Sequence, residues 1–183
     1  MTETAAAIVA AHRAGTLSPA QTVARSFARI REHNDPAIFI SLRDEEEAIA
    51  EAKALSTKDA AKLPLFGVPV AVKDNIDVAG LPTTAACPAF AYTPSRDATA
   101  VARLRANGAI VIGKTNLDQF ATGLVGVRSP YGIPKNPMRG DLIPGGSSSG
   151  RRSRCRPGWY RSLWEPTPRA RAACRRCSTT LSG

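Results

Sequence analysis

Histidine, cysteine and long apolar runs are scarce in this sequence, and each scarcity excludes a class of chemistry. The two histidines, His12 and His33, lie in helical patterns near the N-terminus, so we expect surface positions and no histidine base. Cys87 alone in residues 1–150 gives no disulfide framework, and the single pair Cys174 and Cys177 lacks the second pair of a zinc site. Because we find neither a leader segment nor a run of ~18 apolar residues, we expect a cytoplasmic protein. Residues 1–150 also suggest no metal and no cofactor.

Positive charge is concentrated at the C-terminal end. Residues 151–183 hold nine arginines against one acid, Glu165, which leaves +2 of the net charge of +10 for residues 1–150. Prolines are scattered through this tail and it shows no periodicity, which is typical of disorder. We therefore expect one near-neutral globular portion, residues 1–150, and an aberrant arginine-rich tail, residues 151–183, that is not a domain.

Helical and strand patterns alternate through residues 1–150. Helices are expected at 3–14, 18–34, 44–55 and 97–108, strands at 37–42, 67–77 and 109–115, and a helical turn or two at 116–123. The strands are apolar on both faces, which is typical of a sheet covered by helices. The sequence predicts an α/β fold.

The segment GAIVIGKT, residues 108–115, matches the G-x-x-x-x-G-K-T pattern of a phosphate-binding loop. Its middle residues Ala-Ile-Val-Ile favour an extended strand, which holds the two glycines apart, whereas a phosphate-binding loop must curl so that its amides converge. We interpret this segment as a strand and a turn and expect no nucleotide site.

The segment GSSSG, residues 146–150, matches the G-x-S-x-G elbow of α/β-hydrolases, but no histidine follows it. Without histidine, a lysine whose pKa is lowered by burial can deprotonate a serine for acyl transfer. Lys73 ends an apolar strand beside Asp74 and Asn75 and is the candidate. Taken alone, a lysine in that position is also a common salt-bridge partner.

Three stretches in this order resemble the amidase signature family, serine hydrolases of C–N bonds. They are PLFGVPVAVKDNIDVAGLPTTAACPAF (64–90), DATAVARLRANGAIVIGKTNLDQFATG (97–123) and PGGSSSG (144–150). The resemblance implies the N-terminal part of a mixed sheet covered by helices, and therefore an incomplete fold. The sequence is most similar to allophanate hydrolases, which release ammonia and carbon dioxide in urea degradation. The amidase subunit of glutamyl/aspartyl-tRNA amidotransferase is the alternative.

The resemblance implies a catalytic role for two residues of this chain. Lys73 is expected to act as the general base, and Ser147 as the bridging serine that relays the proton, with a cis peptide bond before it. We also expect Gly123 and Arg128 to line the pocket for a small amide, although both suit ordinary turn and surface positions equally well. A homodimer is compatible with the intact protein.

The nucleophilic serine of the family is missing. It should follow the bridging serine by about two dozen residues, in a D-T-x-G-S-like segment, and Arg171 occupies that position. The chain as written is therefore expected to be inactive. If the codons of Trp164–Arg171 are read from the last base of the tryptophan codon, they permit Gly-Thr-Asp-Thr-Ala-Gly-Ser, of which the code forces only the first glycine. We hypothesise a frameshift near Gly150.

The alternative of a different class is a basic binding module. In that interpretation the arginines of residues 151–183, with Trp159 and Trp164, contact the phosphates and bases of a nucleic acid or bind an anionic membrane. Because the tail has no periodicity that would form a binding face, we expect neither partner.

Overall fold

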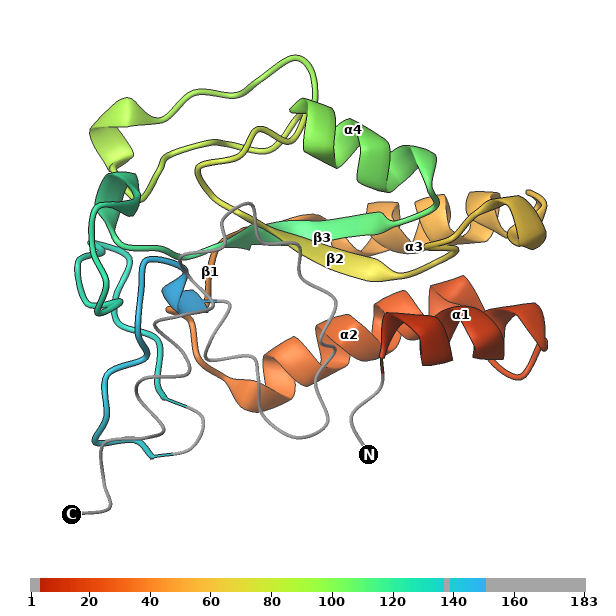
Figure 1. Ribbon diagram of the computed structural model, residues 1–183, viewed down its shortest axis with the longest axis horizontal. Coiled ribbons are helices and arrows are strands. Elements are labelled where there is room, and N and C mark those ends of the chain that lie inside the picture. The colour runs from red at the N-terminus through yellow and green to blue at the C-terminus, as the bar shows by residue number, and fades with distance from the viewer. Residues whose placement is uncertain (1–3, 137–138, 151–183) are drawn as a thin grey trace.

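A three-stranded mixed sheet with helices on both sides forms the framework of the protein in a computed structural model, which describes residues 4–136 and 139–150 (Figure 1). The strands are β1 (Phe39–Leu42), β2 (Pro69–Lys73) and β3 (Ile110–Thr115), in the order β1-β3-β2. The central strand β3 pairs antiparallel with β1 and parallel with β2. The predicted α/β fold is confirmed, while the predictions for residues 151–183 lie outside the described residues.

Within the described residues, four α-helices pack around this sheet. They are α1 (Ala5–Arg13), α2 (Pro19–His33), α3 (Glu45–Leu55) and α4 (Thr99–Ala106). The α4 helix covers one side, α1 and α2 lie on the opposite side, and α3 packs against α2 and β3 (Figure 1). Each begins and ends within two residues of its predicted bounds. In contrast, the segment 116–123 contains only a single 3-10 turn, Gln119–Ala121.

The α2 helix shows how the local sequence sets an element boundary. The Ser18 hydroxyl accepts the Gln21 backbone N–H, and the Gln21 side chain accepts the Ser18 backbone N–H. This capping box satisfies two groups at the helix start, and Pro19 occupies the first turn, where it needs no donor. The helix ends at His33, and the capping residue Asn34 adopts a left-handed conformation.

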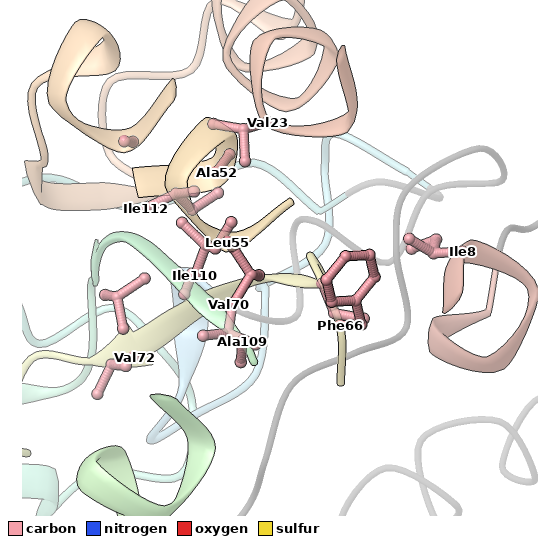
Figure 2. Packing of buried hydrophobic residues seen from close by; sticks show 14 of the residues in the cluster. Ile8, Val23, Ala52, Leu55, Phe66, Val70, Val72, Ala109, Ile110 and Ile112 are labelled. Carbon is pink, nitrogen blue, oxygen red and sulfur yellow. The ribbon is translucent and has the colours of Figure 1, made fainter. Parts of the chain in front are cut away.

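The core lies between the sheet and its helices. All six residues of β3 are buried, because strands flank it on both edges and helices cover both faces. Figure 2 shows Val70 of β2 and Ile110 and Ile112 of β3 packed near Val23 and Leu55 of the helices. The segment GAIVIGKT, residues 108–115, therefore contains a core strand, as predicted, and its first glycine, Gly108, turns the chain at a φ of +92°.

His12 corrects the expectation of a surface histidine, because it is only 7% exposed. Its Nδ1 lies 2.8 Å from the Phe66 carbonyl oxygen, and its Nε2 lies 2.7 Å from the Thr22 hydroxyl. The ring thus joins α1 to α2 and to the chain that enters β2. Burial lowers the pKa of His12 below its ordinary value, despite the hydrogen bond to Phe66. Gly67 leaves room for the ring, since a Cβ there would lie 2.8 Å from it.

Candidate active site

Lys73 and Ser147 are 74 residues apart in the sequence and meet at the end of the sheet. The Lys73 Nζ donates a hydrogen bond of 2.7 Å to the Ser147 Oγ. Both residues are half-buried, and the peptide bond between Gly146 and Ser147 is cis. The structure therefore brings together the lysine and the serine that the sequence singled out.

The strand β2 delivers Lys73 to this position. Its other four residues are buried, and Lys73 stands at its carboxyl end, paired in register with Thr115 of β3. The segment that follows β3 forms hydrogen bonds with the loop that carries Ser147. The Asp118 backbone N–H donates to the Ser147 carbonyl at 2.8 Å, and the Gly150 N–H donates to the Asn116 carbonyl at 3.1 Å. Neighbouring parallel strands thus place the two halves of the site side by side.

Asp118 is a residue of the site that the sequence did not reveal. Its carboxylate is fully buried and accepts the backbone N–H groups of Gly126 at 3.0 Å and Arg128 at 2.9 Å. A Cβ at Gly146 would lie 1.9 Å from the same carboxylate, so the serine loop packs directly on it. Asp118 therefore ties the loop 123–128 to the loop that carries Ser147.

Backbone hydrogen bonds add to this link between the two loops. The N–H of Gly145 donates to the Val125 carbonyl at 3.0 Å, and that of Gly146 donates to the Leu124 carbonyl at 2.8 Å. A short ladder therefore runs beside the buried carboxylate. The position of Ser147 is fixed by groups on both sides of its own loop.

Gly123 and Arg128, the predicted pocket residues, both lie on the loop that Asp118 holds. Gly123 is buried, and a Cβ there would lie 2.3 Å from the Asp118 carboxyl group. Arg128 is exposed, and its backbone contributes one hydrogen bond to Asp118 and one to Gln119. Through these contacts both residues help to hold the loop 123–128 in place. Their role in substrate binding stays a prediction.

A second lysine, Lys114, lies buried in the sheet next to the site. Its Nζ lies 3.4 Å from the Asp74 Oδ1 and donates to the Pro82 carbonyl at 3.1 Å and to the Thr83 hydroxyl at 3.0 Å. The other carboxylate oxygen of Asp74 accepts the hydroxyl and the N–H of Thr84. Burial lowers the pKa of Lys114, and the charge of Asp74 opposes that shift. Sequence patterns did not reveal this pair, because Lys114 stands in an otherwise apolar strand.

Within residues 4–136 and 139–150, no group of three or more His, Cys, Asp or Glu side chains is arranged to hold a metal ion. No helix in this part of the chain is long and apolar enough to cross a membrane. The position expected for the nucleophilic serine, Arg171, lies outside the described residues.

Comparisons with known proteins identify a family and several relatives. The profile of the family called Amidase matches residues 21–152. The urea amidolyase of Saccharomyces cerevisiae is 57% identical over 113 residues, which are 61% of this chain and 6% of that protein. A glutamyl-tRNA(Gln) amidotransferase subunit from Symbiobacterium thermophilum is 42% identical over 144 residues, which are 75% of this chain and 29% of that protein.

Among solved structures, the allophanate hydrolase of Kluyveromyces lactis matches with a TM-score of 0.71 and 44% sequence identity. The match covers 81% of this chain and 25% of that structure. The chain therefore spans a small part of the length of the relatives that it matches.

Proposed function

Because the chain belongs to the amidase family, we propose that the protein carrying these residues hydrolyses the C–N bond of a small amide. The hydrogen bond of 2.7 Å between Lys73 and Ser147 is the observation that supports this function most directly. A lysine and a serine in contact can move a proton, and together they replace the histidine that other serine hydrolases use. Of the two histidines in the described residues, His12 is engaged with Thr22 and Phe66, and His33 lies at the end of α2.

In the proposed reaction, Lys73 enters the cycle as the neutral amine. The amine takes the proton of the Ser147 hydroxyl, and Ser147 in turn takes the proton of a nucleophilic serine supplied elsewhere in the protein. That serine attacks the amide carbonyl, and the proton returns through Ser147 to the leaving nitrogen, so that ammonia departs and an acyl-enzyme remains. Water then attacks the acyl group by the same relay run again, which releases the acid and restores the serine.

Allophanate is the substrate that we propose, with release of ammonia and carbon dioxide as the outcome. The support is the similarity to urea amidolyase and to allophanate hydrolase, together with the Amidase profile, whose matched range of residues 21–152 includes Lys73 and Ser147. The amidase component of a tRNA-dependent amidotransferase is the second candidate, and the similarity to glutamyl-tRNA(Gln) amidotransferase subunits favours it. The two differ in amide donor, allophanate in one case and glutamine in the other.

The test uses the full-length protein that carries these residues and measures ammonia released from allophanate. We expect Lys73→Ala and Ser147→Ala each to lower kcat by a factor on the order of 10³, because each removes a step of proton transfer. Lys62→Ala and Ser95→Ala are matched controls at exposed positions and should keep the wild-type rate.

Turnover that persists in either site variant would reject its catalytic role. Release of ammonia from glutamine, but not from allophanate, would favour the amidotransferase function instead.

A further inference from the structure

Lys73 and Asp74 are neighbours of opposite charge at the end of β2, yet the structure gives them different partners. Successive side chains of an extended strand point to opposite faces. Lys73 donates to Ser147, whereas the Asp74 carboxylate lies beside Lys114 and accepts two hydrogen bonds from Thr84. The carboxylate nearest to Lys73 along the chain is thus engaged by a different cation.

The pair of Asp74 and Lys114 is shielded from solvent. Both side chains are 0% exposed, and an unpaired charge would be costly there. Lys114 lies 3.4 Å from both the carboxylate and the main-chain carbonyl of Asp74 and reaches Pro82 and Thr83 as well. The geometry therefore holds the carboxylate of Asp74 against the amine of Lys114, one residue beyond the strand end that carries Lys73.

We propose that Lys114 acts as a positioning and charge-balancing residue, which neutralises Asp74 so that the amine of Lys73 loses its proton readily. This inference rests on the proposed function of Lys73 as a base. A carboxylate close to a lysine stabilises the ammonium form and makes the lysine a weaker donor of its lone pair at neutral pH. With Lys114 in place, its positive charge offsets the negative charge of the adjacent Asp74 carboxylate, and Lys73 keeps its contact with Ser147.

Three other carboxylates on the elements around Lys73 also have partners. Asp77 accepts the Tyr92 hydroxyl at 2.8 Å, and Asp97 forms an ion pair of 3.4 Å with Arg105 of α4. Asp118, after β3, accepts two backbone N–H groups. The wall that α4 contributes to the cavity beside Lys73 is apolar and consists of Ala100, Val101 and Leu104. Among the described residues, Asp74 is therefore the carboxylate whose negative charge, if left unpaired, is expected to affect the protonation of Lys73 most.

The experiment measures the pKa of Lys73 itself in the full-length protein. The rate at which acetic anhydride labels Lys73 is followed by mass spectrometry across pH, and the midpoint of that curve reports the loss of the ammonium proton. A change in accessibility scales the rate but leaves the midpoint in place. The readout requires no turnover, so it stays valid if the proposed reaction is wrong.

We expect Lys114→Met to raise the midpoint of Lys73 by about one pH unit, because it leaves the Asp74 carboxylate unbalanced. Adding Asp74→Asn to Lys114→Met should return the midpoint to the wild-type value. The control Lys62→Met removes the cation of an exposed ion pair with Asp59 and should leave the midpoint unchanged.

The same midpoint in wild type and Lys114→Met would overturn the proposal, and so would a double variant that stays as high as the single one. If Lys114→Met does not fold, Lys114→Gln retains donors for Pro82 and Thr83 without the charge, and the same two outcomes decide. Where the full-length protein is active, its pH–rate profile should shift upward in parallel with the labelling curve.

Discussion

At the scale of single residues, Asp118 holds together the loops around Ser147. Its carboxylate accepts the N–H groups of Gly126 and Arg128, and its own N–H donates to the Ser147 carbonyl. Asp118→Asn keeps the size of the side chain but turns a donor toward one of the two N–H groups. We expect the free energy of unfolding to fall by about 1–3 kcal/mol, because a buried N–H loses its partner. Urea unfolding of the full-length protein measures this loss.

Asp141→Asn is the matched control for that change. Asp141 is exposed and pairs with Arg139 on the surface, where an ion pair contributes little. Equal stabilities of the two variants would show that the Asp118 carboxylate does not hold the loops.

His12 makes the stability of the protein depend on pH. Its pKa in the folded state lies below its ordinary value, mainly because it is buried, so the unfolded chain binds a proton that the folded chain excludes. The stability is fully present above the unfolded pKa of about 6.5 and is lost as pH falls from there toward the folded pKa. The urea concentration at the midpoint of unfolding should therefore decrease as the pH is lowered from about 7 to about 5.

In His12→Gln this part of the pH dependence should disappear, although the variant is less stable overall because Phe66 and Thr22 lose their partner. An unchanged slope in His12→Gln would assign the pH dependence to other groups.

At the scale of elements, local patterns were enough to predict the helices and strands but not the loops of the site. The capping box of Ser18 and Gln21 and the apolar run of β3 depend on neighbours in sequence, so they can be recognised in the sequence alone. The loop from 123 to 128 takes its shape from the distant carboxylate of Asp118 and from the backbone of Gly145 and Gly146. No local pattern encodes such contacts.

The strand pattern singled out Lys73, whereas the resemblance pointed to Ser147 and to the role of both residues, and the parallel pairing of β2 with β3 explains why they meet. For Lys114 and His12, the sequence pattern predicted the element but not the burial of the side chain. Their helical or strand pattern was clear, but whether each side chain is buried depends on packing against other elements.

At the scale of the whole molecule, the described residues leave apolar surface and sheet edges uncovered. Leu124 is 77% exposed, and Phe90 and Phe120 are about half exposed and stack edge to face. Within the described part of the chain, β1 and β2 each pair only with β3. The match to 25% of the length of the allophanate hydrolase structure leads us to propose that further chain covers these surfaces in the full-length protein.

The change of composition after Gly150 leads to a prediction about the gene. The Amidase profile ends at residue 152, two residues after Gly150, where the arginine-rich segment begins. In the alternative frame, the code forces valine across Trp159 and Tyr160, and glycine across Trp164 and Glu165. The segment that follows can then encode Gly-Thr-Asp-Thr-Ala-Gly-Ser, which would supply the nucleophilic serine that the proposed mechanism needs.

We therefore expect resequencing of the DNA from codon 100 onward to reveal one inserted or deleted base near codon 150, and a long open frame beyond it. Codons 110–115 serve as the internal control, because the written frame there gives the buried strand β3. Tryptic peptides of the expressed protein distinguish the two frames directly, since the written frame has nine arginines in residues 151–183, eight of which are not followed by proline. Peptides that match the written arginine-rich sequence would refute the frameshift, and the missing serine would then have to come from another chain or the hydrolytic function would fall.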